Sequence, residues 1–294
     1  MSNALSPQGL GALLASAGSA TRPQTDTGNL HEFQLILLAA GVCALMVWTV
    51  RRIAHPRKLA LQRTPGRPNT INPLHVVLGL LVWQGVGGAT AALLFRRMGP
   101  DAPRALILSQ LAAQAALLPT TLLLAAATFR NGLRRGMGLS LRHWPWDLVR
   151  GILGYLVAFP VCIALLALAR WVMPEAWVRP HPALTALQRL SPAWQVVTVV
   201  TVVVLAPLAE ETFFRGLLQS MLRRYTRRPW AAIVLTSACF AAAHMANPDQ
   251  VPPLFALAVV LGYNYERTGR LTSPLLIHAV FNAVTLIAWF TRAA

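Results

Sequence analysis

The sequence predicts an all-α polytopic membrane protein of about eight transmembrane helices, on three observations. Of its 294 residues, 55% are hydrophobic and only 12% are charged, about half the charged fraction of a typical soluble domain. The mean hydropathy is +0.52. Apolar residues also fall into runs close to the roughly 20 residues that a helix needs to cross the hydrocarbon layer. This composition excludes a water-soluble globular domain and a disordered chain.

Four uncharged stretches predict the first four spans. They cover residues 33–50, 73–95, 105–129 and 151–169. Residues 31–170 are therefore expected to form the N-terminal group of transmembrane helices. Residues 1–30 are rich in Ser, Gly, Ala and Thr, and we expect them to form a flexible tail.

Four more helices are predicted in the second half, where polar residues enter the apolar runs. Beyond a proline-rich extracytoplasmic connection, these runs cover residues 193–209, 230–243, 252–265 and 271–290. The first run meets Glu210 and Glu211, and the basic turn does not arrive until Arg223. That helix should therefore continue for about three more turns, which places both acids inside the membrane.

The cations predict the orientation in the membrane. The net charge is +17, but Arg and Lys form short clusters between apolar runs rather than one basic patch, so nucleic acid is not an expected partner. The loops after the first, third, fifth and seventh helices hold 17 cations, and the opposite side holds 8. This asymmetry predicts a cytoplasmic location for the basic loops and an extracytoplasmic location for both termini. With 25 Arg and one Lys, the composition is typical of a GC-rich bacterium, which indicates the inner (plasma) membrane.

The two buried acids are the first candidate functional residues. An ionisable side chain at this depth costs a few kcal/mol, so it is a functional hypothesis by default. Adjacent helical residues point about 100° apart, and Glu210 and Glu211 cannot both face one cavity. Glu211 and Arg215 are spaced i, i+4 with the acid first, the favourable order for an ion pair. Glu210 then remains free to face the cavity.

Two histidines and an asparagine are predicted at a matching depth. Counted from the turns near Arg227 and Gly269, the residues Glu211, His244, His278 and Asn282 lie on the order of 10 to 20 Å below the cytoplasmic surface. His278 and Asn282 share one helix face, as do Phe240 and His244. We therefore expect three helices to contribute to one site.

This set of side chains predicts a hydrolytic site. Glu210 can take a proton from water while His244 orients that water. Hydrolysis of a peptide bond also needs donors for the developing oxyanion, which His278 and Asn282 could supply. Glu210, His244 and His278 could hold a Zn²⁺ ion with an open fourth position. Glutamate and histidine can also activate water without a metal, so the sequence leaves both mechanisms open.

Two other functions use the same residues. Intramembrane Glu and His also serve as relays in proton-coupled or cation-coupled transporters, which commonly contain an inverted repeat; we detect none. A non-catalytic immunity or scaffold protein could bind a partner through the same cavity.

Four motifs add a resemblance to a known family. Glu210, Glu211 and Arg215 read EExxxR, Phe240 to His244 reads FxxxH, and His278 to Asn282 reads HxxxN; Phe255 and Tyr263 form the remaining pair. In this order the motifs resemble the CPBP family of intramembrane endopeptidases, which comprises the CAAX prenyl protease type 2 and bacteriocin-processing groups. The resemblance spans about residues 193–290.

The resemblance implies a catalytic four-helix core within residues 190–294, with a cavity open to the cytoplasm. It makes Glu210 the catalytic glutamate, His244 its partner, and His278 with Asn282 the oxyanion-stabilising motif. Glu211, Arg215, Phe240, Phe255 and Tyr263 become supporting residues. Members are often described as metalloendopeptidases, and a metal-free mechanism has also been argued.

The resemblance also implies a class of substrate. Eukaryotic members cleave prenylated CAAX proteins. In a bacterium, a membrane-associated peptide, a bacteriocin-like precursor or a C-terminal sorting tail is the expected substrate, and the lipid bilayer is the other expected partner.

Overall fold

Helices form most of the chain in the computed structural model, which describes residues 27–55, 61, 66–99, 101–178 and 182–293. Within these ranges the β-structure consists of one isolated bridge, between Asn69 and Phe129. The predicted all-α class is confirmed. In chain order, the elements are α2 (Thr27–Ala54), α4 (Pro73–Met98), α5 (Pro103–Thr128), the π-helix η3 (Gly132–Met137), α6 (Trp144–Val172), the 3₁₀-helix η4 (Glu175–Trp177), α7 (Pro182–Leu187), α8 (Pro192–Val200), the π-helix η5 (Thr201–Leu205), α9 (Ala206–Glu211), the π-helix η6 (Thr212–Gln219), α10 (Ser220–Thr226), α11 (Pro229–Ala242), the 3₁₀-helix η7 (Pro248–Gln250), α12 (Val251–Thr268) and α13 (Thr272–Ala293).

In the described chain, α8 to α10 form one continuous segment from Pro192 to Thr226. With this segment counted once, eight helical segments occupy the positions of the eight predicted spans. Six segments of the described chain are long and apolar enough to cross a membrane: Glu32–Ala54, Pro73–Met98, Pro103–Thr128, Trp144–Val172, Pro192–Thr226 and Thr272–Thr291. Helices α11 and α12 fall outside this set. The chain is therefore polytopic, and the number eight stays a prediction.

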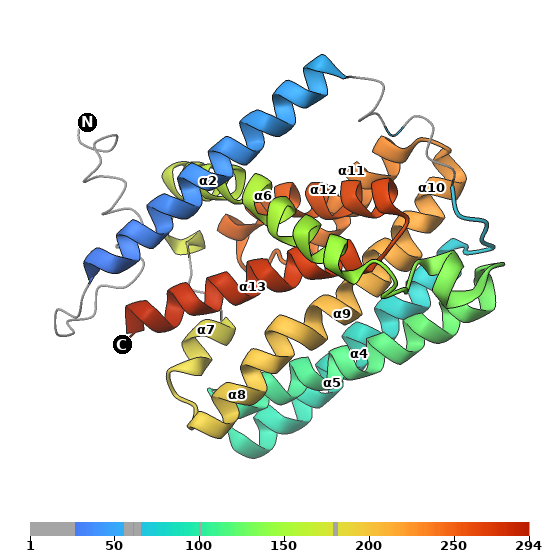
Figure 1. The fold of residues 1–294 in the computed structure, drawn as a ribbon. Helices are drawn as coiled ribbons and strands as arrows, with labels where there is room; N and C mark the ends of the chain where they lie inside the picture. Colours follow the sequence, from blue (N-terminus) through green and yellow to red (C-terminus); the bar gives the residue numbers. More distant parts are fainter. Residues whose placement is uncertain (1–26, 56–60, 62–65, 100, 179–181, 294) are drawn as a thin grey trace.

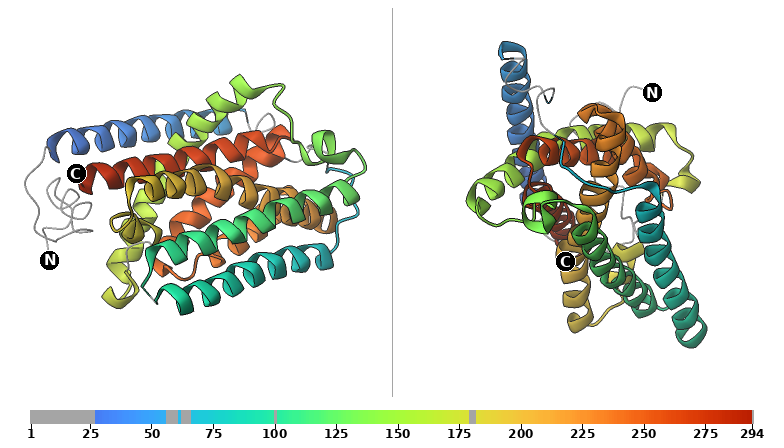
Figure 2. Two further views of the ribbon diagram at one scale, coloured as in Figure 1. Left: turned by 90° about the horizontal axis from the view of Figure 1, so that it is seen from below. Right: turned by 90° about the vertical axis from the view of Figure 1, so that its right-hand side faces the viewer.

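The continuous segment α8–α10 lies at the centre of the helical bundle. It contacts the α4–α5 hairpin on one side and α11, α12 and α13 on the other. Helix α6 packs against α12 and α13, and α2 packs along α6 at one edge of the bundle (Figures 1 and 2). Residues of the central segment therefore have neighbours from both halves of the chain.

The turns that end these helices lie where the sequence places them. Helix α10 ends at Thr226 with Arg227 in the left-handed conformation (φ 56°), and α11 begins at Pro229. Helix α12 ends at Thr268 with Gly269 at φ 69°, a conformation that glycine adopts without steric cost. These positions confirm the reference points used above to compare residue depths.

The predicted flexible tail, residues 1–30, lies outside the described residues up to residue 26. Helix α2 begins at Thr27, four residues before the predicted start of the N-terminal helical group.

Candidate active site

The two acids lie at the end of α9, between the π-helices η5 and η6. Single π-helical turns within α-helices occur frequently at functional sites. In η5 the N–H of Ala206 bonds to the carbonyl of Thr201, five residues earlier. Pro207 has no N–H for the next bond in this series, which would reach Val202. The Asn282 side chain of α13 donates to that carbonyl instead, at 2.8 Å from Nδ2 to oxygen.

Glu211 joins two helices through one carboxylate oxygen. Its Oε1 accepts a hydrogen bond from Arg215 Nη1 at 2.8 Å and lies 2.9 Å from Nδ1 of His278. Arg215 is fully buried and also donates from Nη2 to the carbonyl of Ala258 on α12. The predicted ion pair between Glu211 and Arg215 is confirmed. The bond to His278 was not predicted.

Glu210 points toward the other half of the chain. Only 7% of this residue is exposed, and its Oε1 accepts a hydrogen bond from Nε2 of Gln114 on α5 at 3.1 Å. The partners of the adjacent acids thus lie on different helices, α5 and α13. This agrees with the predicted angle between the two side chains.

Phe240 connects the FxxxH motif to the buried charges. Its ring centroid lies 4.7 Å from the Arg215 guanidinium carbon, 4.9 Å from the His244 ring and 5.7 Å from the His278 ring. Nδ1 of His244 lies 2.8 Å from the Phe240 carbonyl oxygen. Because a carbonyl only accepts, Nδ1 is the donor there, and in the neutral ring Nε2 is left as an acceptor. These contacts connect Glu211 and Arg215 to both imidazoles, whereas the hydrogen bond found for the Glu210 carboxylate among the described residues is the one with Gln114.

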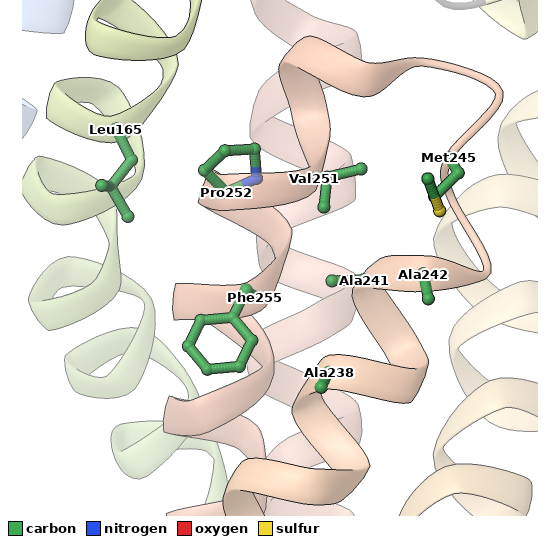
Figure 3. Close-up of a pocket in the computed structure, with 8 residues that line it drawn as sticks. All are labelled: Leu165, Ala238, Ala241, Ala242, Met245, Val251, Pro252 and Phe255. Atoms are coloured by element: carbon green, nitrogen blue, oxygen red, sulfur yellow. The ribbon is translucent and has the colours of Figure 1, made fainter.

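The structure places the other predicted supporting residues elsewhere. Tyr263 stacks on Trp230 of α11, with ring centroids 5.9 Å apart, and meets Trp48 of α2 edge-on at 6.2 Å. Phe255 faces an apolar groove between α6, α11 and α12 (Figure 3).

This groove has a volume of about 410 Å³, within the range of small-molecule sites. Ala241, Ala242 and Met245, which flank His244 in sequence, form one side of it. It lies at the ends of α11 and α12 that are remote from the basic turns at Arg227 and Gly269. The predicted opening of the cavity toward the cytoplasm stays a prediction. The full lining comprises Leu165, Ala238, Ala241, Ala242, Met245, Val251, Pro252 and Phe255.

The predicted metal ligands do not assemble in this structure. Among the residues that it describes, no group of three or more His, Cys, Asp or Glu side chains could hold a metal ion. The Glu210 carboxylate bonds Gln114 on α5, whereas the imidazoles of His244 and His278 contact Phe240. The set Glu210, His244 and His278 therefore does not fit a Zn²⁺ ion here.

Gln114 is the residue of this site that the sequence reasoning missed. The predicted span 105–129 contains two amide side chains, Gln110 and Gln114, and polar residues within a membrane span are functional candidates. That signal was available in the sequence. The choice between the two required the structure, in which Gln114 is buried and Gln110 is half-buried.

Comparisons with known proteins agree with the motifs. Residues 192–284 match the family described as type II CAAX prenyl endopeptidase Rce1-like. The chain is also similar to an uncharacterized 24.3 kDa protein of Escherichia coli, with 36% identity over 86 residues. That alignment covers 28% of this chain and 40% of the relative, so the chain matches less than half of the relative's length. No solved structure gives a significant match. Together, the helical architecture and the family match identify an integral membrane protein with a segment, residues 192–284, that matches the type II CAAX prenyl endopeptidase Rce1-like family.

Proposed function

We propose that this protein is an intramembrane endopeptidase that hydrolyses a peptide bond with water activated by Glu210 and His244. The family match supports a CAAX-type protease. The observation that supports the finer proposal is the chain of contacts from the half-buried His244 through Phe240 to His278, Glu211 and Arg215, together with the buried carboxylate of Glu210, the neighbour of Glu211 in the sequence.

The first step is attack by water on the scissile carbonyl. Glu210 accepts one proton of the water, and His244 Nε2 accepts a hydrogen bond from the other and so orients the nucleophile. The water oxygen bonds to the carbonyl carbon while the electron pair of the C=O double bond moves to the carbonyl oxygen. Glu210 then carries the proton as a carboxylic acid.

The negative oxygen formed in this step needs hydrogen-bond donors. When His278 carries protons on both ring nitrogens, Nδ1 donates to Glu211 and Nε2 is left to donate to the oxyanion. Asn282 has a second amide hydrogen besides the one that reaches Val202. As the C–N bond breaks, Glu210 returns its proton to the departing nitrogen. The products are an amine and a carboxyl group, and Glu210 is a carboxylate again.

The apolar groove favours a substrate with apolar groups beside the scissile bond, because its lining carries no charged side chain. A membrane-associated peptide, a bacteriocin-like precursor, a C-terminal sorting tail and a prenylated CAAX protein all meet this requirement. We propose that the basic turns at Arg227 and Gly269 face the cytoplasm of a bacterium, with both termini on the other side of its inner membrane.

The test compares two glutamate variants in cells. Glu210→Gln removes the proposed base, and Glu175→Gln removes an exposed carboxylate of η4 as a matched control. New N-termini in the membrane proteome, identified by amine labelling and mass spectrometry, should appear with the wild type and Glu175→Gln and disappear with Glu210→Gln. All three proteins must be present in the membrane at equal amounts. New N-termini that persist in Glu210→Gln would contradict the proposal, because cleavage would then not depend on Glu210.

A further inference from the structure

We propose that Gln114 is a positioning residue for Glu210, so that the N-terminal half of the chain completes the active site. The amide of Gln114 holds one oxygen of the Glu210 carboxylate and leaves the other to accept the proton of the attacking water. This inference rests on the proposed function. It extends the site beyond residues 192–284, the segment that matches the family.

The placement of the two side chains carries the inference. Gln114 lies on α5, which packs along α9 and η6 of the central segment. Each of the two residues is only 7% exposed. Nε2 of Gln114 lies 3.1 Å from Oε1 of Glu210, and within the described part of the chain this is the hydrogen bond found for the Glu210 carboxylate. A buried carboxylate without a donor would be costly.

The chemistry of the amide suits a carboxylate that changes its protonation state. A neutral N–H donor to a carboxylate forms a charge-assisted bond, which is stronger than a bond between neutral groups. After Glu210 has taken a proton from water, it can itself donate. Oε1 of Gln114 is buried and has no hydrogen-bond partner among the described residues, so a rotated amide can accept from the protonated acid. An apolar side chain at position 114 could neither donate to the Glu210 carboxylate nor accept a hydrogen bond from the protonated acid.

A purely structural role for Gln114 predicts a different outcome. If the bond only held α5 against α9, its loss would reduce the amount of folded protein and leave the turnover of each folded molecule unchanged. Kinetic and spectroscopic measurements on folded protein therefore separate the two roles.

The experiment compares Gln114→Met with Thr121→Val. Methionine keeps the length of the side chain and removes the amide. Thr121 lies two turns further along α5, is fully buried, and has a hydroxyl without a partner in the described chain, so its variant controls for the loss of a buried polar group. Both proteins are reconstituted in liposomes, and kcat and KM are measured with a peptide whose cleavage depends on Glu210. Gln114→Met should lower kcat about 10- to 100-fold and leave KM unchanged. This is the rate factor that corresponds to the loss of one hydrogen bond to a charged group.

Infrared spectroscopy adds a readout that needs no substrate. The difference between wild type and Glu210→Gln isolates the absorption band of the Glu210 carboxyl group. That band should shift in Gln114→Met and in Gln114→Asn, whose amide is one methylene shorter, and stay in place in Thr121→Val. An unshifted band in Gln114→Met, or a kcat equal to that of Thr121→Val, would overturn the inference alone. Proteolysis that persists in Glu210→Gln would instead contradict the proposed function.

Discussion

Removal of the Glu211 charge should destabilise the centre of the protein more than most single substitutions. In Glu211→Gln, the Arg215 guanidinium loses its anionic partner while both side chains stay at 0% exposure. His278 loses the carboxylate that lies 2.9 Å from its Nδ1. The substitution therefore leaves the buried Arg215 charge without an opposite charge, which is strongly destabilising.

The size of the effect follows from burial. Breaking a buried ion pair by removing one partner costs about 3 to 5 kcal/mol. Arg215 keeps a hydrogen bond to the Ala258 carbonyl and the face of the Phe240 ring, so we expect the lower end, about 3 kcal/mol. The double variant Glu211→Gln/Arg215→Met removes both charges and should lose only about 1 kcal/mol, mainly for the bond to His278.

Reversible unfolding in detergent micelles, followed by circular dichroism, measures these free energies of unfolding. The double variant should be more stable than Glu211→Gln, because the two changes are coupled. A Glu211→Gln variant within about 1 kcal/mol of the wild type would refute the reasoning. The reasoning would also be refuted if the double variant lost as much unfolding free energy as Glu211→Gln and Arg215→Met lose together.

Two further predictions concern contacts between helices. Asp147 of α6 is fully buried and accepts hydrogen bonds from Arg270 and Thr272. The Arg270 side chain is 22% exposed, so water can still solvate its charge when the carboxylate is removed. Asp147→Asn should therefore lower the free energy of unfolding by about 2 kcal/mol. The exposed Asp101→Asn should change stability by less than about 0.5 kcal/mol, and an equal loss in both variants would argue against the Asp147 contact. Asn282→Leu should cost about 1 to 3 kcal/mol, because the Val202 carbonyl loses its donor. The loss of stability caused by Asn282→Leu should be smaller in a Pro207→Ala background, because the N–H of residue 207 can then donate to the Val202 carbonyl. An equal loss in the wild-type and Pro207→Ala backgrounds would show that Pro207 does not free this carbonyl.

The helices and the Glu211–Arg215 pair could be predicted from the sequence because both depend on local rules. Apolar runs fix where a helix can lie in a bilayer, and proline at the first turn with Gly269 at a helix end marks the boundaries. An i, i+4 ion pair needs only the helical repeat. The turns near Arg227 and Gly269 followed from the same signals.

Contacts between helices could not be predicted from these local rules. Depth can be counted along the sequence, but the rotation of each helix and the identity of its neighbours depend on packing across the whole bundle. The bonds from Gln114 to Glu210 and from Asn282 to Val202, and the contact of His278 with Glu211, are all of this kind. That Pro207 lacks an N–H is evident from the sequence, but the structure was needed to identify Asn282 as the donor to the Val202 carbonyl.

The most direct test of the central claim is the rate of peptide-bond hydrolysis by purified Glu210→Gln in liposomes, measured beside Glu175→Gln. We expect the Glu210→Gln rate to fall at least about 100-fold, the usual contribution of a general base, while the rate of Glu175→Gln stays at the wild-type value. Equal rates in the two variants would contradict the assignment of Glu210 as the group that activates water.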